Sequence, residues 1–346
     1  MTDSQHSCQT VAGVWSRLWE EDPLRAADDE IDRTTLVLWT QTPSGVYIDL
    51  RLPLGSPGRL EGRKCPEALL ARGFSHSQDF LNNIFKQKSF AGRLEFSKGD
   101  TTDGKALEKD EILLQLSKQA PVYTCFWKRE IDFQPPTGGL DIGVCCNSSG
   151  SEIRETGYDG SYAEGWKLLD GTKEGPFLAM ELVSENGVAR TGFWVRAGKH
   201  FAYAIGRPKN AELAEQLMCP LESSNIHQSV GKTLQEAMTN VEENVATRMV
   251  HCYVSVFGEI TMRTDGLQKC WQILYSTHPD LVGCTLFEMS ASDELGKKAD
   301  SNCSILKPIT NLEASMEVEQ VLKVGHEELT RIWKVVEVSS KDVLIS

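Results

Sequence analysis

The most constraining feature of the sequence is the stretch 122–136, VYTCFWKREIDFQPP. Side chains in a strand repeat every two residues, so its alternation predicts one long β-strand. Two prolines end it, because proline cannot donate to a sheet ladder. Arg129 shares the predicted inner face with aromatic residues, and a buried arginine needs an acidic or hydrogen-bonding partner. That face carries Tyr123, Cys125, Trp127, Arg129, Ile131 and Phe133.

Short alternating segments separated by turn residues fill the first half of the chain and favour antiparallel β-structure. The clearest hairpin joins 34–42 to 46–52 through Pro43-Ser44-Gly45. About eight such strands suffice to close a small barrel. We therefore predict an N-terminal barrel over residues 10–170. Its strands are expected at 11–20, 34–42, 46–52, 90–96, 122–136, 140–146, 152–156 and 162–169.

The second half repeats this plan with one interruption. Apolar residues at three- and four-residue spacing predict a helical insertion over 211–250. We expect a mainly β fold in which a second antiparallel barrel covers residues 175–340, with the boundary at 170–175. Its strands are predicted at 176–183, 190–196, 200–206, 252–261, 270–277, 283–289, 320–324 and 331–338.

Composition narrows the class of protein. A net charge of −13 argues against a general surface for nucleic acid or anionic membrane. No apolar run approaches the roughly 20 residues of a membrane span, and the N-terminus lacks the features of a signal peptide. The ten cysteines show no paired ligand spacing, which favours buried reduced thiols over disulfides or zinc. We expect a cytoplasmic protein without metal, cofactor, membrane span or nucleic-acid partner.

Charged residues stand where core residues are expected in two further segments. In 46–52, VYIDLRL, Tyr47, Asp49 and Arg51 share one face, and apolar residues share the other. In 154–166, Glu155, Tyr162 and Glu164 lie close together in the sequence. Facing inward, these groups would give a polar, ion-paired lumen suited to a ligand with a carboxylate or other oxygen functions. Facing solvent, they would pair across strands and contribute little to stability.

Tryptophans and the absence of catalytic motifs bear on function. All eight tryptophans fall inside predicted strands, where core packing is the main interpretation and contact with a ligand the alternative. No GxSxG, HExxH, P-loop or GxGxxG motif occurs.

Acid/base catalysis would use titratable side chains whose pKa values shift in an apolar cavity. The candidates are Asp49, Glu155, Tyr162 and Glu164.

Several stretches resemble a largely uncharacterised family of two-domain lipocalin-like proteins. They are Gly13-Val14-Trp15, WSRLW, TTLVLWTQTPSGVYIDLRLP, SFAGRLEF, CFWKREIDFQPP, the ETG…YAEGW segment and WQILYSTHP. The family has shorter bacterial members and a distant yeast member that interacts with a casein kinase. The resemblance implies two packed calycin-like barrels and no settled activity, so no catalytic residue follows from it.

Three functions remain open. The first is binding of a small hydrophobic or amphipathic molecule in the N-terminal lumen, where Arg51 and Arg129 would hold an acidic or carbonyl group. The second is an isomerase, cyclase or hydratase in the same lumen, favoured if a buried carboxyl of raised pKa lies beside Tyr162. The third is a scaffold for a protein partner, with barrels filled by side chains. The predicted ligand contacts are Trp15, Trp39, Tyr47, Arg51, Trp127, Arg129 and Trp166.

Overall fold

The structure is a computed structural model of the chain. It describes residues 11–21, 31–53, 86–97, 110–134, 140–147, 149–207, 253–262, 269–278, 281–283, 304–306, 312–324 and 327–339. The predicted helical insertion, 211–250, lies outside the described residues. Within the described residues, no helix is long and apolar enough to cross a membrane.

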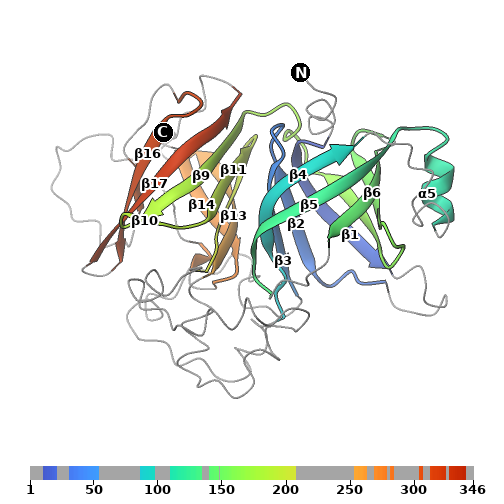
Figure 1. The fold of residues 1–346 in the computed structure, drawn as a ribbon, viewed down its shortest axis with the longest axis horizontal. Helices are drawn as coiled ribbons and strands as arrows, with labels where there is room; N and C mark the ends of the chain where they lie inside the picture. Colours follow the sequence, from blue (N-terminus) through green and yellow to red (C-terminus); the bar gives the residue numbers. More distant parts are fainter. Residues whose placement is uncertain are drawn as a thin grey trace, which may run out of the picture.

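Eight antiparallel strands close into a barrel in the first half, as predicted (Figure 1). Each strand pairs with the next in the chain, and the last pairs back to the first. Closure removes the exposed sheet edges that an open sheet would leave. The strands are β1 (Gly13–Glu21), β2 (Leu36–Gln41), β3 (Val46–Leu52), β4 (Phe90–Ser97), β5 (Val122–Asp132), β6 (Asp141–Asn147), β7 (Glu152–Gly157) and β8 (Ala163–Leu168).

A β-bulge in β5 changes which face its later residues occupy. The pairing with β4 shifts at Gly92, so Glu130 has no residue opposite it. One extra residue reverses the alternation of side chains. Arg129 consequently lines the interior, whereas Ile131 packs outside the barrel. The prediction that both share one face was wrong, because the bulge lies between them.

A short helix, α5 (Glu111–Leu116), covers part of the outer wall at the right of Figure 1. Asp110 caps it by accepting a hydrogen bond from the Leu113 backbone N–H, 2.9 Å away. The same carboxylate accepts from Arg154 of β7 at 2.7 Å. Leu113 is fully buried and packs against Val144 of β6. The cap therefore ties the helix to the barrel through both charge and apolar contact.

The second half forms a nine-stranded antiparallel sheet. Its order is β14-β13-β12-β11-β9-β17-β16-β15, with β10 paired to β9. Among the described residues no pairing joins the end strands β14 and β15, so a second closed barrel stays a prediction. The strands are β9 (Phe177–Glu185), β10 (Val188–Ala189), β11 (Gly192–Ala197), β12 (His200–Ile205), β13 (Val254–Met262), β14 (Lys269–Ser276), β15 (Ser304–Leu306), β16 (Glu317–Val324) and β17 (Glu327–Val338).

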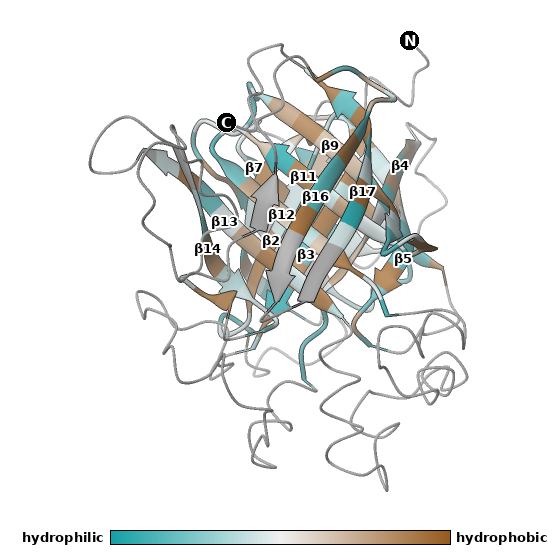
Figure 2. Ribbon diagram, turned by 90° about the vertical axis from the view of Figure 1, so that its left-hand side faces the viewer, coloured by the Kyte–Doolittle hydropathy of each residue, from teal (hydrophilic) through white to brown (hydrophobic). Residues whose placement is uncertain are grey.

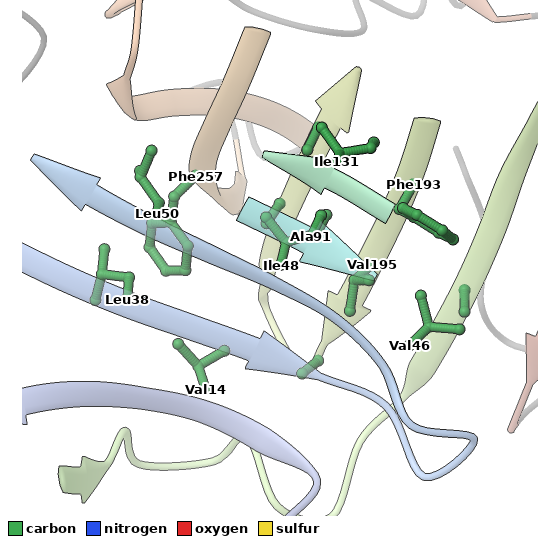
Figure 3. Packing of buried hydrophobic residues seen from close by; sticks show 14 of the residues in the cluster. Val14, Leu38, Val46, Ile48, Leu50, Ala91, Ile131, Phe193, Val195 and Phe257 are labelled. Atoms are coloured by element: carbon green, nitrogen blue, oxygen red, sulfur yellow. The ribbon is translucent and has the colours of Figure 1, made fainter. Parts of the chain in front are cut away.

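The barrel and the second sheet share one hydrophobic core (Figure 3). Ile48 and Leu50 of β3 point out of the barrel and meet Phe193, Val195 and Phe257 of the second sheet. Burial of each such side chain contributes about 1.5–3 kcal/mol. The alternation of apolar and polar residues that builds these faces is visible along the strands in Figure 2. The predicted boundary at 170–175 falls between β8 and β9, and the division into two domains stays a prediction.

Candidate functional site in the lumen of the first barrel

Tryptophans fill the apolar part of the barrel interior. The ring of Trp39 lies 6.0 Å from that of Trp15, 5.0 Å from that of Trp127 and 5.6 Å from that of Trp166, centroid to centroid. Trp15, Trp39 and Trp166 are buried almost completely, and Tyr47 completely. Edge-to-face and stacked contacts of this kind add to the energy of area burial. These four side chains therefore occupy the packed core of the lumen.

A row of three glutamates crosses the neighbouring strands β7, β8 and β1. Glu155 stands directly opposite Glu164, and Glu164 stands directly opposite Glu20. Like charges in such positions repel each other. Arg17 relieves the repulsion on one side, since its guanidinium contacts Glu20 and lies 2.8 Å from Glu164. Arg51 lies 3.1 Å from Glu164 on the other side. Two of the three carboxylates therefore have a cation, whereas Glu155 has none in the described part of the chain.

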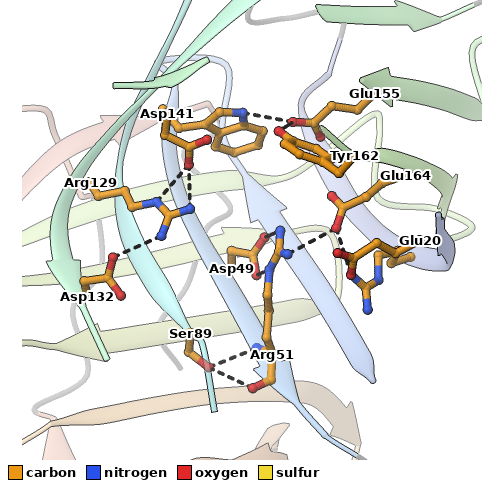
Figure 4. Close-up of polar contacts among 12 residues, drawn as sticks. Glu20, Asp49, Arg51, Ser89, Arg129, Asp132, Asp141, Glu155, Tyr162 and Glu164 are labelled. Atoms are coloured by element: carbon orange, nitrogen blue, oxygen red, sulfur yellow. Dashed lines mark hydrogen bonds and ion pairs between the residues drawn. The ribbon is translucent and has the colours of Figure 1, made fainter. Parts of the chain in front are cut away.

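Arg51 and Arg129 each lie between two carboxyl groups (Figure 4). Besides Glu164, Arg51 contacts Asp49 at 2.9 Å. Arg129 contacts Asp132 at 3.0 Å and Asp141 at 2.6 Å. Burial lowers the pKa of Arg129, but the charges of Asp132 and Asp141 outweigh it and hold that pKa above its ordinary value. Both guanidinium groups are therefore charged and fully engaged.

Phe90 lies beneath the two arginines. The guanidinium of Arg129 lies 3.7 Å from the centre of its ring, and that of Arg51 lies 5.2 Å away. A cation over an aromatic face is attracted by the negative face of the ring. Phe90 thus helps to position both guanidinium groups beside the lumen.

Glu155 is 2% exposed and receives two hydrogen bonds on one oxygen. The Trp127 indole N–H donates to Oε1 at 3.1 Å, and the Tyr162 hydroxyl donates to the same atom at 3.2 Å. The second oxygen, Oε2, has no hydrogen-bond partner among the residues that the structure describes. Burial raises the pKa of Glu155 from 4.5 to about 8, and the charges of Glu164 and Asp141 add to this rise. Glu155 is thus mostly protonated at neutral pH.

A glycine makes room for this carboxyl group. Gly143 on β6 faces Glu155, and a Cβ atom at that position would lie 2.6 Å from Oε1. Real Cβ atoms do not approach oxygen so closely, so any side chain there would displace the carboxyl. The position of Glu155 consequently depends on residue 143 as well as on Trp127 and Tyr162.

A cavity of about 100 Å³ lies among these groups. It is smaller than the engineered cavity of about 150 Å³ that holds benzene and smaller than most drug-binding pockets. At its edge the side chains of Arg129 and Asp141 keep 32% and 24% exposure. The lining residues are Glu20, Arg51, Phe90, Trp127, Arg129, Asp141, Glu155, Tyr162 and Glu164.

The sequence-predicted residues divide into two groups. Arg51, Trp127, Arg129, Glu155, Tyr162 and Glu164 line the cavity. Trp15, Trp39, Tyr47 and Trp166 belong to the packed core, and Asp49 is fully buried behind Arg51. Ligand contact by the residues of the second group stays a prediction.

Sequence reasoning missed several members of the site. Arg17 could have been predicted from the sequence, because it shares a predicted strand face with Trp15. Glu20 enters the lumen only because the pairing of β1 shifts after Arg17. Asp132 was predicted to lie on the opposite face from Arg129, and the bulge reverses this placement. The missed residues are Arg17, Glu20, Phe90, Asp132 and Asp141.

Two other predictions concern cysteines and metals. Cys125, Cys145 and Cys146 are free and buried, in keeping with reduced thiols. Burial raises the pKa of each of these thiols, which makes them poor nucleophiles. Within the described part of the chain, no group of three or more His, Cys, Asp or Glu side chains is placed to hold a metal ion.

Comparisons with known proteins give a distant structural neighbour. No protein-family model matches the chain, and no curated protein matches it. A crystal structure of the uncharacterized protein YLR301w from Saccharomyces cerevisiae is similar over 95% of this chain and 99% of that one, with 12% sequence identity and a TM-score of 0.44. At this level the similarity carries no conclusion about activity.

Proposed function

We propose that the first barrel binds a small molecule in the charged cavity of its lumen. The observation that carries this proposal is Glu155, which lines the cavity with one carboxyl oxygen unpartnered. A buried polar atom without a hydrogen bond costs about 1–3 kcal/mol. A ligand that accepts a hydrogen bond from the protonated oxygen, or donates one to the ionised oxygen, would recover this energy.

The cavity limits the size and character of the ligand. Its volume, about 100 Å³, accommodates roughly four non-hydrogen atoms, in proportion to the cavity of about 150 Å³ that holds benzene. Phe90 and Trp127 offer apolar walls, and the remaining lining residues are polar or charged. The ligand is therefore small and amphipathic, or it places a small polar head in the cavity.

Nuclear magnetic resonance of the tryptophan indole groups tests this proposal. The Trp127 indole N–H donates to Glu155 and reports on the cavity. The Trp333 indole N–H donates to Gln320 in the second sheet and serves as the internal control. Titration with polar fragments of about four non-hydrogen atoms should move the Trp127 signal and leave that of Trp333 in place. Equal movement of both signals, or of neither, would contradict binding in the cavity.

A second candidate function is acid/base catalysis, as in an isomerase, cyclase or hydratase. Its specific support is Glu155, whose pKa of about 8 suits proton transfer near neutral pH. Protonated Glu155 would donate a proton from a carboxyl group that also accepts from Tyr162. Glu164, held between Arg17 and Arg51, provides a second carboxyl group in a different environment, a pattern typical of acid/base pairs.

Recovery of a bound compound distinguishes the two functions. Native mass spectrometry of the purified protein, followed by analysis of released molecules, would identify what the lumen holds. Incubated with that compound, a catalyst returns a changed product, and Glu155→Gln abolishes the change while binding persists. If the protein only binds the compound, both the natural protein and Glu155→Gln return it unchanged.

A further inference from the structure

The charges in and directly behind the cavity do not balance. Four guanidinium groups lie among or behind seven carboxyl groups, and protonation of Glu155 leaves an excess of two negative charges at neutral pH. The cations are Arg17, Arg51, Arg129 and, through backbone carbonyl groups behind Asp132, Arg207. The acids are Glu20, Asp32, Asp49, Asp132, Asp141, Glu155 and Glu164.

The arginines that could attract an acidic ligand are already occupied. Arg51 is shared by Asp49 and Glu164, and Arg129 contacts both Asp132 and Asp141. An incoming carboxylate would have to displace one of these partners and leave it buried without its cation, which is costly. The sequence-based expectation of an acidic ligand is therefore disfavoured by the contacts themselves.

The unpartnered carboxyl oxygen points to the opposite charge. Glu155 has no ion pair among the described residues, and its Oε2 atom accepts no hydrogen bond. An ammonium group carries three donors and no acceptor, so it can supply the donor and the positive charge that Glu155 lacks, while Glu164 and Asp141 already contact arginines. Phe90 and Trp127 on the same wall suit the methylene groups that follow such a head.

From this geometry we infer that the cavity takes a small organic cation, a primary ammonium head on a short apolar stem, and not an acidic ligand. The inference rests on the proposed binding function and specifies its ligand class. An organic cation fits better than a metal ion, because the carboxyl groups do not converge into a metal-binding cluster in the described residues.

Binding of a cation should release a proton. Glu155 holds a proton until about pH 8, and a bound ammonium group favours the ionised carboxylate. Affinity should therefore rise about 50-fold from about pH 6 to about pH 8. Ionisation of Asp132, whose pKa burial raises to about 6, acts in the same direction. The groups that face Glu155 are Glu20, Arg51, Trp127, Arg129, Asp141, Cys145, Tyr162 and Glu164.

Matched series of small probes test the inference. Methylamine, ethylamine and propylamine are titrated against acetate, propionate and butyrate, against ethanol and propanol, and against calcium chloride. The Trp127 indole signal measures binding, with Trp333 as the control. Amines should move the signal, with an affinity that rises with pH, and the other probes should not.

Two variants complete the test. Glu155→Gln should weaken amine binding at least tenfold at about pH 8 and leave only the small pH dependence that Asp132 contributes. Glu95→Gln, on the exposed outer wall of β4 where Glu95 pairs with Lys128, should leave both unchanged. Undiminished amine binding by Glu155→Gln overturns the inference.

The remaining outcomes distinguish failure of the inferred ligand class from failure of the proposed binding function. Binding of carboxylates, alcohols or calcium in place of amines overturns the cationic ligand and leaves a binding cavity. No movement of the Trp127 signal by any probe overturns both.

Discussion

Two buried glutamates, one in each half of the molecule, behave oppositely. Glu155 in the barrel is 2% exposed, and Glu185 in the second sheet is 1% exposed. Burial raises the pKa of both, but Arg331 and Arg190 contact Glu185 and bring its pKa below the ordinary value. Glu155 has acidic neighbours in place of such cations, and its pKa rises to about 8. Burial alone therefore does not decide the direction of the pKa shift of a carboxyl group; the sign of the surrounding charge does.

The tryptophan clusters of the two halves sharpen this contrast. Trp194 in the second sheet contacts Trp271 and Trp333 with ring centroids 6.0 Å and 5.7 Å away. Trp39 has the same kind of neighbours in the barrel. Both clusters are core packing, and among the described residues the row of Glu155, Glu164 and Glu20 lies beside the cluster of the barrel. The cavity lies against this row.

The largest expected effect is at Glu185. Glu185→Gln leaves Arg190 and Arg331 buried against a neutral amide, and breaking a buried ion pair costs about 3–5 kcal/mol. We expect the free energy of unfolding at neutral pH to fall by about 3 kcal/mol, measured by urea denaturation. A loss no greater than that of an exposed pair would show that the two arginines are solvated.

Glu155→Gln should change stability in the other direction. The folded pKa of Glu155 is about 8, above an unfolded value of 4.5, so the fold holds a proton that the unfolded chain releases. Its contribution is full below about pH 4.5 and is lost as the pH rises to about 8, at up to about 1.4 kcal/mol per pH unit. The variant should lack this slope and be the more stable protein at about pH 8.

Urea denaturation of the natural protein and of Glu155→Gln, from about pH 4.5 to about pH 8, isolates the contribution of Glu155 to the free energy of unfolding. The difference between their unfolding free energies should grow steadily with pH. A constant difference would mean that Glu155 titrates normally and that the contrast with Glu185 does not exist.

A smaller effect is expected at Gly143. Gly143→Ala places a Cβ atom against Glu155 Oε1, and overpacking of this kind costs about 1–3 kcal/mol. The cost should shrink when Glu155→Ala removes the atoms that it meets. A double-mutant cycle on unfolding free energies, with the Trp127 indole signal recorded in each variant, measures this coupling. If the losses of unfolding free energy in Gly143→Ala and Glu155→Ala simply added in the double variant, the new Cβ atom would not be strained against Glu155.

The smallest effect belongs to the outer wall. Glu95 and Lys128 form an ion pair on β4 and β5, and each side chain is 56% exposed. Exposed pairs contribute about 0–1 kcal/mol, so Glu95→Gln should shift the unfolding free energy by less than about 1 kcal/mol. Added salt should reduce even this difference. If Glu95→Gln lowered the free energy of unfolding as much as Glu185→Gln, burial would not account for the large effect at Glu185.

Sequence alone determined the β class, the number of strands in the first barrel and the faces of β3. Tyr47, Asp49 and Arg51 line the interior and Ile48 and Leu50 pack outside, because a period of two needs no knowledge of the partner strand. It also identified Glu155, Tyr162 and Glu164 as neighbours, since Glu155 and Glu164 pair across one hairpin and Tyr162 directly precedes its second strand. Local alternation carries all of this information.

Only the tertiary structure decided which charges meet. A bulge at Glu130 brings Asp132 to Arg129, and barrel closure brings Arg17 of β1 to Glu164 of β8. Closure also leaves Glu155 without an ion pair among the described residues, and this arrangement is the basis of the proposed cationic ligand. The physical reason is that charge balance depends on distances between strands far apart in the chain. Strand alternation is local to each segment and contains no such distances.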